Sequence, residues 1–440
     1  MNTLGYTLPR WEAGAVGVMF GLLAIGAGEL PTLAQQPGPP PPPSANVSVF
    51  AMGLENPRGV KFGPDGMLYV AEGGRGGNVS SVGRCEQVVP PIGPYLGSQA
   101  SGRISRITSS GQRTTVTDTF PSSQTSPDSG NLVSGVADIE FLGDTLYAMV
   151  TGAGCSHGVA DVPNGIARVN ADGTWRIVAD LGAFLKANPV KNPNPPDFEP
   201  DGTWYSMAKV GNDLYAVEPN HGELDKITTA GQISRVADIS ATQGHVVPTA
   251  IAVRDGDFYV TTLGTFPVHR GTQKVYRVTP GGQVSAYASG LTAALGLAFD
   301  NQGRLYVLET STQDNAEPTP GTGRVVRVSA AGDLEVVASS LTTPTAMTFG
   351  PDGQLYVSHL GFGPPPGAGQ VVRIDVTGIP QPAASPSSTA AGAAPVVRAR
   401  DGQTLATQSA ATQAMFQTVW GDGAGARWVQ EHEAELARHG

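Results

Sequence analysis

The chain has 440 residues, a formal net charge of −10, 58 glycines and only 15% charged residues. Binding nucleic acid without regard to sequence needs clustered Lys and Arg for phosphate contacts, and this acidic chain contains no basic run. Its glycine content and sparse charge favour many short strands joined by tight turns over a helical enzyme.

The N-terminal segment is typical of an exported protein. Arg10 precedes an apolar stretch at residues 13–28, and Thr32-Leu33-Ala34 supplies the small residues that signal peptidase reads. We predict a signal peptide at 1–34, a proline-rich linker at 35–45, and a secreted or periplasmic mature protein with no membrane span. The apolar stretch is shorter than the roughly 20 residues of a spanning helix. The alternative is an uncleaved N-terminal anchor.

A strand of the type Leu-Tyr-Val recurs along the chain, each time after a tight turn built from Gly, Asp, Asn or Pro. Before each turn lies a short apolar strand with small residues, such as 295–299, which suits strands crowded around one axis. The six copies begin at Leu68, Leu146, Leu214, Phe258, Leu305 and Leu355.

Each copy is followed by two further strands, which gives four strands per unit. Six such units predict an all-β fold, a six-bladed β-propeller over residues 46–378. The sixth unit lacks its fourth strand, and residues 47–54 resemble the fourth strand at 284–291. We therefore predict that an N-terminal strand at about 46–54 completes the last blade and leaves no inner edge unpaired. The low-complexity tail at 379–440 is predicted to be largely disordered, and the protein to be a monomer.

Propeller topology places the long loops on one face, here called the long-loop face, and the tight turns on the other. Scaffolds place binding groups on such loops at little cost in stability. The long loops cover residues 73–101, 119–133, 151–164, 183–203, 263–272, 310–322 and 360–368.

Equivalent positions at the ends of the Leu-Tyr-Val strands carry Glu72, Val150, Glu218, Thr262, Glu309 and His359. In a closed ring these positions are expected to surround the axis at similar depth. Glu72, Glu218 and Glu309 are therefore candidate ligands of a hard cation such as Ca²⁺, or acid–base groups together with an imidazole. The alternative is that each Glu pairs with a neighbouring Arg or caps a strand end.

Histidines and cysteines also fall in the long loops. His221 joins His157, His245, His269 and His359 on this face, either as a functional imidazole or as ordinary solvated side chains. Cys85 and Cys155 lie in matching loops of adjacent blades. An exported chain with two such cysteines is expected to join them in a disulfide.

The run from Gly53-Leu54-Glu55-Asn56-Pro57 to Glu72-Gly73-Gly74 resembles the opening of the ScyD/ScyE family, as do the bulky loop with Cys85 and the strand 102–107. That family consists of exported, NHL-like propellers related to biosynthesis of the pigment scytonemin. The resemblance implies the fold, export, and a role in assembling an extracytoplasmic metabolite. It assigns no catalytic residue.

Two classes of function remain open. One is a propeller that binds a small molecule or a protein on the long-loop face, where aromatic residues such as Tyr95, Phe198 and Phe266 lie. The other is an enzyme: a Ca²⁺-dependent lactonase similar to the SMP-30/gluconolactonase proteins, with metal on Glu72, Glu218 or Glu309, or a relative of quinone-dependent sugar dehydrogenases. The fold does not choose between them.

Overall fold

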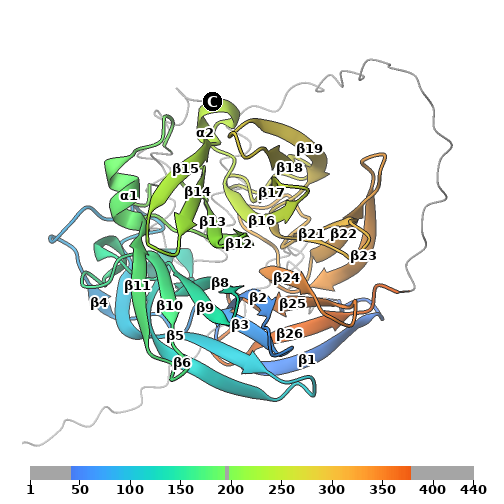
Figure 1. Ribbon diagram of the computed structural model, residues 1–440, viewed down its shortest axis with the longest axis horizontal. Helices are drawn as coiled ribbons and strands as arrows, with labels where there is room; N and C mark the ends of the chain where they lie inside the picture. Colours follow the sequence, from blue (N-terminus) through green and yellow to red (C-terminus); the bar gives the residue numbers. More distant parts are fainter. Residues whose placement is uncertain (1–40, 194–197, 378–440) are drawn as a thin grey trace, which may run out of the picture. The chain divides into compact units, whose positions relative to one another are not determined.

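The computed structural model describes residues 41–193 and 198–377, and these residues form six antiparallel sheets around a central axis (Figure 1). The prediction of an all-β, six-bladed propeller is confirmed. From the inside outward, the first three blades comprise β2 (Pro57–Phe62), β3 (Leu68–Glu72), β5 (Leu96–Ile107) and β6 (Arg113–Gln124); β8 (Val136–Leu142), β9 (Thr145–Val150), β10 (Gly165–Val169) and β11 (Trp175–Asp180); and β12 (Ser206–Val210), β13 (Asp213–Glu218), β14 (Glu223–Thr228) and β15 (Ile233–Asp238).

The second half repeats this arrangement. The innermost strands of neighbouring blades contact one another all the way around, with β24 against β2 at the closure. The last three blades comprise β16 (Pro248–Arg254), β17 (Asp257–Thr262), β18 (Gln273–Val278) and β19 (Val284–Leu291); β20 (Ala294–Phe299), β21 (Leu305–Glu309), β22 (Gly323–Val328) and β23 (Leu334–Leu341); and β24 (Ala346–Phe349), β25 (Leu355–His359), β26 (Gly369–Ile374) and β1 (Val47–Leu54).

The N-terminal strand closes the ring as predicted. β1 pairs antiparallel with β26, with Val47 opposite Ile374 and Leu54 opposite Gly369. The Asn46 side chain donates 3.0 Å hydrogen bonds to the carbonyls of Asp375 and Val337, which ties the closure to the fifth blade. The first and last strands of the propeller thus hold each other in place.

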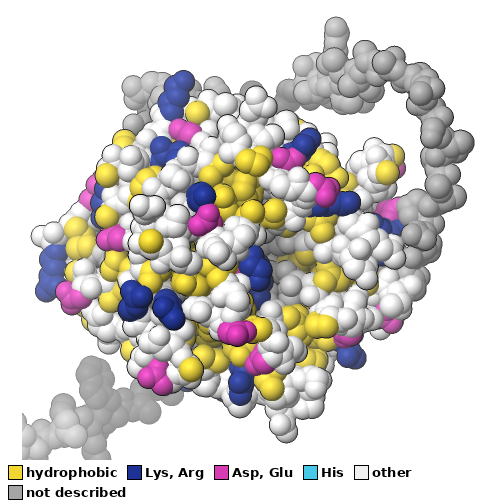
Figure 2. Space-filling model, viewed as in Figure 1, with side chains coloured by type: hydrophobic (Ala, Val, Ile, Leu, Met, Phe, Trp, Pro, Cys, Tyr) yellow, Lys and Arg dark blue, Asp and Glu magenta, His cyan; other side chains and the backbone are white. Residues whose placement is uncertain are grey.

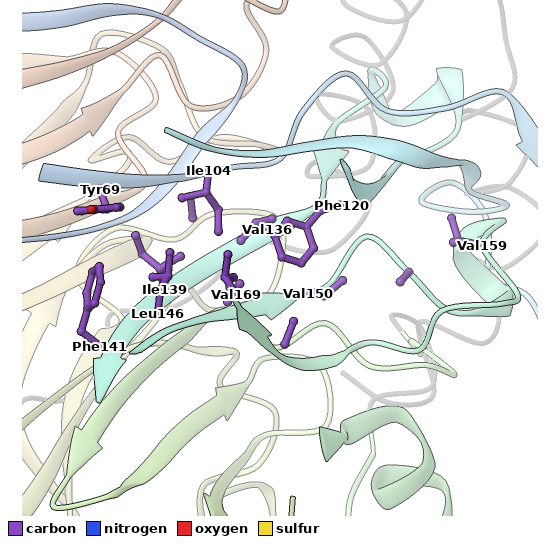
Figure 3. Close-up of a cluster of buried hydrophobic side chains, with 14 residues drawn as sticks. Tyr69, Ile104, Phe120, Val136, Ile139, Phe141, Leu146, Val150, Val159 and Val169 are labelled. Carbon is purple, nitrogen blue, oxygen red and sulfur yellow. The ribbon is translucent and has the colours of Figure 1, made fainter. Parts of the chain in front are cut away.

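The recurring tyrosine of the sequence motif has a packing role between blades. Tyr69 meets Phe141 of the second blade edge-to-face, with ring centroids 4.9 Å apart. Aromatic pairs in this geometry contribute about 0.5–1.5 kcal/mol beyond burial. Figure 3 shows Tyr69 and Phe141 at one end of the apolar cluster that joins the first two blades. The same contact recurs in Tyr259–Phe299, Tyr306–Phe349 and Tyr356–Phe62.

The long-loop face contains more regular structure than the sequence indicated. In the first blade β5 begins at Leu96 and β6 runs to Gln124, so the loops expected at 73–101 and 119–133 are shorter and contain the two-residue strands β4 (Val79–Ser80) and β7 (Val133–Ser134). The loop between β6 and β7 also holds the 3-10 turn η1 (Pro127–Ser129), and other connections hold η2 (Cys155–His157), α1 (Leu181–Ala187) and α2 (Ser240–Gln243).

The predicted signal peptide, most of the linker, and the tail at 379–440 lie outside the described residues. Within the part that the structure describes, no helix is long and apolar enough to cross a membrane.

Candidate functional site

Glu72, the first of the six equivalent positions, is fully buried at the end of β3. Its carboxylate accepts hydrogen bonds from Arg103 at 2.9 and 2.5 Å and one from the Ser105 hydroxyl. It also accepts a 2.6 Å bond from the backbone N–H of Glu55, in the segment that enters the first blade. The side chain therefore holds this entering segment against its own blade.

The same arrangement recurs in other blades. Glu309 accepts from Arg324 and, at 2.6 Å, from the N–H of Thr292. Glu218 accepts from the N–H of Thr203 at 2.9 Å. The ring of His359 does likewise, because its Nε2 accepts a 2.8 Å bond from the N–H of Thr342. In four of the six blades this position thus anchors the segment that enters the blade.

Thr262 differs slightly, since its hydroxyl bonds Gln273 at 2.9 Å and accepts from the N–H of Lys274. The walls of the axial cavity come from the innermost strand of each blade and the residues next to it, not from these six positions. Glu72, Glu218 and Glu309 each lie in a separate blade, at the end of the second strand, and none lines the axial cavity. Among the described residues, no three His, Cys, Asp or Glu side chains are placed to hold a metal ion. The expected alternative, pairing with a neighbouring Arg, describes Glu72 and Glu309.

The loops of the first two blades and the segment entering the third blade form one buried polar platform. The structure joins Cys85 and Cys155 in the expected disulfide. Tyr95 donates a 2.7 Å hydrogen bond to Glu199, and the Ser156 hydroxyl donates a 2.6 Å bond to Asp201. We call these six side chains the loop platform: Cys85, Tyr95, Cys155, Ser156, Glu199 and Asp201.

Three histidines are packed within the loops of this face. His157 is fully buried, edge-on to Tyr95 at 4.6 Å, and burial lowers its pKa to about 4. His221 is buried too. Its backbone N–H donates to the Glu218 carboxylate, and its ring Nε2 lies 3.1 Å from the backbone carbonyl of Glu199. His245 has a pKa lowered to about 4, first by burial and then by the nearby His221. These imidazoles pack inside the loops, so the expectation of solvated histidines fails for them.

Two carboxyl groups of the third blade are buried side by side. Glu223 pairs with Arg235, and Asp225 accepts a 3.0 Å bond from the indole N–H of Trp204. Burial raises the pKa of both groups and the charge of Glu218 adds to this effect, while Asp225 further raises the pKa of Glu223. The folded protein therefore retains a proton here at pH values where an unfolded chain has released it.

This pair predicts a stability that falls as pH rises. Between about pH 7 and 8.5, raising the pH favours the unfolded chain by up to about 1.4 kcal/mol per pH unit for each retained proton. Glu223→Gln is expected to flatten this slope in denaturant unfolding measured across that range, whereas the exposed Glu86→Gln leaves it unchanged. A wild-type stability that rises with pH in this window contradicts the assignment.

The axial channel has two unlike halves. The inner strands of the first three blades supply Lys61, Asp138, Tyr205 and Ser206, whereas those of the last three supply an apolar wall. Figure 2 shows one face hollowed near its centre, with Lys or Arg side chains beside the hollow. The apolar wall consists of Ala250, Ile251, Leu295, Leu297, Ala346 and Met347, with Gly296 among them.

Charged side chains of the inner strands form hydrogen bonds and ion pairs from one blade to the next. Asp138 accepts from the Met207 N–H at 2.8 Å and from the Ser206 hydroxyl at 3.1 Å. Lys61 and Lys209 share Glu140, at 3.5 and 3.3 Å. These contacts tie the inner strands of the first three blades together.

Tyr205 lines the channel, and Arg58 lies close to it on the side of the long loops. The Tyr205 hydroxyl donates a 3.0 Å bond to the carbonyl of Thr345, which precedes the inner strand of the opposite blade. The Arg58 guanidinium donates to the carbonyls of Gly361 and, at 2.6 Å, Val133. Sequence reasoning missed both residues. For Arg58 the available signal was a charged residue in an inner strand, β2, and for Tyr205 there was no comparable signal.

Comparisons with known proteins name no family for this chain. The chain matches no protein-family profile and no curated protein. Among solved structures it is similar to a streptogramin B lyase (15% identity, 75% of this chain and 97% of that chain, TM-score 0.42). It is also similar to a putative glucose dehydrogenase from Thermus thermophilus (18%, 74% and 99%, 0.45) and a gluconolactonase from Xanthomonas campestris (12%, 74% and 89%, 0.45). At these identities and scores the likeness concerns the propeller alone.

Proposed function

We propose that this protein is an exported, ScyD/ScyE-like propeller that binds a small molecule or a protein partner with its long-loop face and assists the assembly of a metabolite outside the cytoplasm. The observation that carries this proposal is that the candidate catalytic carboxylates are already bonded within the protein. Glu72 and Glu309 are each 0% exposed and bonded to an arginine and a backbone N–H. A metal-dependent lactonase using these residues would first have to break such pairs, and breaking a buried pair costs several kcal/mol.

The construction of the long-loop face supports binding. The loop platform is held by a disulfide and buried hydrogen bonds, and preorganised loops lose little entropy when they bind. Apolar side chains project from this face, among them Val82 at 60% and Phe266 at 51% exposure. Exposed apolar groups around a rigid platform are suited to contact a partner or a largely apolar molecule.

The competing lactonase hypothesis gives a direct test. The chain, purified after export, is assayed for hydrolysis of δ-gluconolactone with added Ca²⁺ and with chelator, and its thermal unfolding is followed in parallel. We expect no Ca²⁺-dependent hydrolysis and the same melting temperature in both conditions. Hydrolysis that requires Ca²⁺ and is lost in Glu309→Gln, while the exposed Glu86→Gln retains it, overturns the proposal in favour of the lactonase.

A further inference from the structure

Arg58 carries a positive charge beside the channel, next to Tyr205 of its lining, with no acidic partner among the described residues. Of the described residues, none forms an ion pair with it, and its bonds run only to the carbonyls of Gly361 and Val133. A guanidinium has five N–H donors in a planar fork, so donors remain beyond those two bonds. A charge held away from water is costly unless it is paired. Burial accordingly lowers the pKa of Arg58.

The other charges of the channel do not compensate Arg58. The cavity is lined by one positive and one negative side chain, Lys61 and Asp138, and Glu140 is shared between Lys61 and Lys209. Asp138 and Glu140 bond Lys61, Lys209 and groups of the third blade, so the unmatched charge falls on Arg58. In a protein of net charge −10, an unpaired cation at the axis is an arrangement suited to an anionic ligand.

The surroundings of Arg58 indicate which kind of anion. Tyr205 lies at the same end of the channel, and burial raises its pKa to about 12, so its hydroxyl stays a neutral donor. Below these two residues the cavity wall is apolar on the side of the last three blades, with Ile251, Leu295 and Met347. Two donors next to an apolar wall match a molecule with a planar anionic head and an apolar body.

We propose that Arg58 anchors a binding site for a small organic carboxylate at the long-loop end of the axial channel. The planar fork of Arg58 pairs with both carboxylate oxygens, and the apolar body lies against the wall of the last three blades. Because the bond from Tyr205 to Thr345 spans the channel, a ligand that enters from the long-loop face breaks it. The freed hydroxyl then becomes a further donor to the carboxylate. This site deepens the proposed binding function and rests on it.

The test uses three probes of matched size or charge: benzoate, its neutral analogue benzamide, and inorganic phosphate. By isothermal titration calorimetry with the exported chain, we expect benzoate to bind about tenfold or more tightly than benzamide, the value of one charge-assisted pair. Arg58→Gln is expected to erase this preference. The matched control Arg176→Gln, at an exposed arginine of β11, keeps it.

A second variant keeps the test decisive if Arg58→Gln does not fold. Arg58→Lys retains the charge but not the planar fork, and is expected to lose part of the benzoate affinity. Equal binding of benzoate and benzamide, or benzoate binding unchanged in both Arg58 variants, overturns the proposal. Phosphate that binds as tightly as benzoate and needs Arg58 also overturns it, by indicating an inorganic-anion site. The Ca²⁺-dependent hydrolysis assay is independent of these outcomes, so the general binding function and the carboxylate site fail separately.

Discussion

Replacing Glu72 with alanine is expected to lower the free energy of unfolding by about 3–5 kcal/mol, the usual cost of leaving one partner of a buried ion pair alone. The Arg103 side chain, only 10% exposed, would lose its two hydrogen bonds to Glu72 and keep only the more distant carboxylate of Glu55, at 3.5 Å. The N–H of Glu55 and the hydroxyl of Ser105 would lose their acceptor as well. The measurement is denaturant unfolding of the exported chain, followed by intrinsic fluorescence.

Two further variants separate charge from packing. The exposed Glu86→Ala is the matched control in the same blade and is expected to change stability by less than about 0.5 kcal/mol. Replacing Glu72 and Arg103 together with apolar residues is expected to recover part of the loss, because no lone charge then remains buried. A Glu72→Ala variant as stable as the Glu86→Ala control contradicts the anchoring role and frees Glu72 for another function.

The fold could be predicted because each blade repeats the same short sequence pattern of turn and strand residues. The turn before each Leu-Tyr-Val strand needs Gly, Asp or Asn for its backbone geometry, and the Asp of two of these turns also accepts a hydrogen bond from the motif tyrosine, as Asp65 does from Tyr69 at 2.9 Å. That tyrosine then packs on the next blade. The turn residues, the strand pattern and the packing of the tyrosine therefore all predict the same fold, and a fold can be predicted from sequence when such local signals agree.

The candidate site could be predicted only in part. Sequence equivalence grouped Glu72, Glu218, Glu309 and His359. In the structure each of these four side chains accepts a hydrogen bond from a backbone N–H of the segment that enters its blade. Sequence equivalence could not say what that shared position contacts, because the partners of Glu72 come from the third strand of its blade and from the entering segment. The partners follow from strand register, as with Glu72 opposite Arg103 and Glu309 opposite Arg324.

Arg58 shows a different limit of sequence reasoning. Its neighbours along β2 give no sign of its acceptors, which come from β7 at the outer edge of the first sheet and from a loop of the last blade. Such contacts exist only once the ring has closed. A single charged residue in an inner strand is a weak pattern by itself. It gains meaning only when the other charges of the channel are seen to be paired.

Removing the disulfide is the second change with a large expected effect. Cys85 and Cys155 are separated by 70 residues, and cross-linking a loop of that size is expected to destabilise the unfolded chain by about 4 kcal/mol on the chain-entropy account. The double variant Cys85→Ala with Cys155→Ala should therefore unfold at markedly lower denaturant concentration. Wild-type protein unfolded under reducing conditions should shift by a similar amount, whereas the variant should ignore the reductant.

The effect should also be local, because the disulfide ties the loops of the first two blades into the loop platform. Ser81 donates to the carbonyl of Cys155, and Ser156 donates to Asp201, so loss of the cross-link is expected to loosen residues 79–95 and 153–160 before the blades themselves open. Hydrogen exchange measured on the double variant should show faster exchange in these loops and unchanged exchange in β16 to β26. Equal stability of variant and wild type, or loss of protection spread evenly over all six blades, would show that the platform is held by its hydrogen bonds and not by the cross-link.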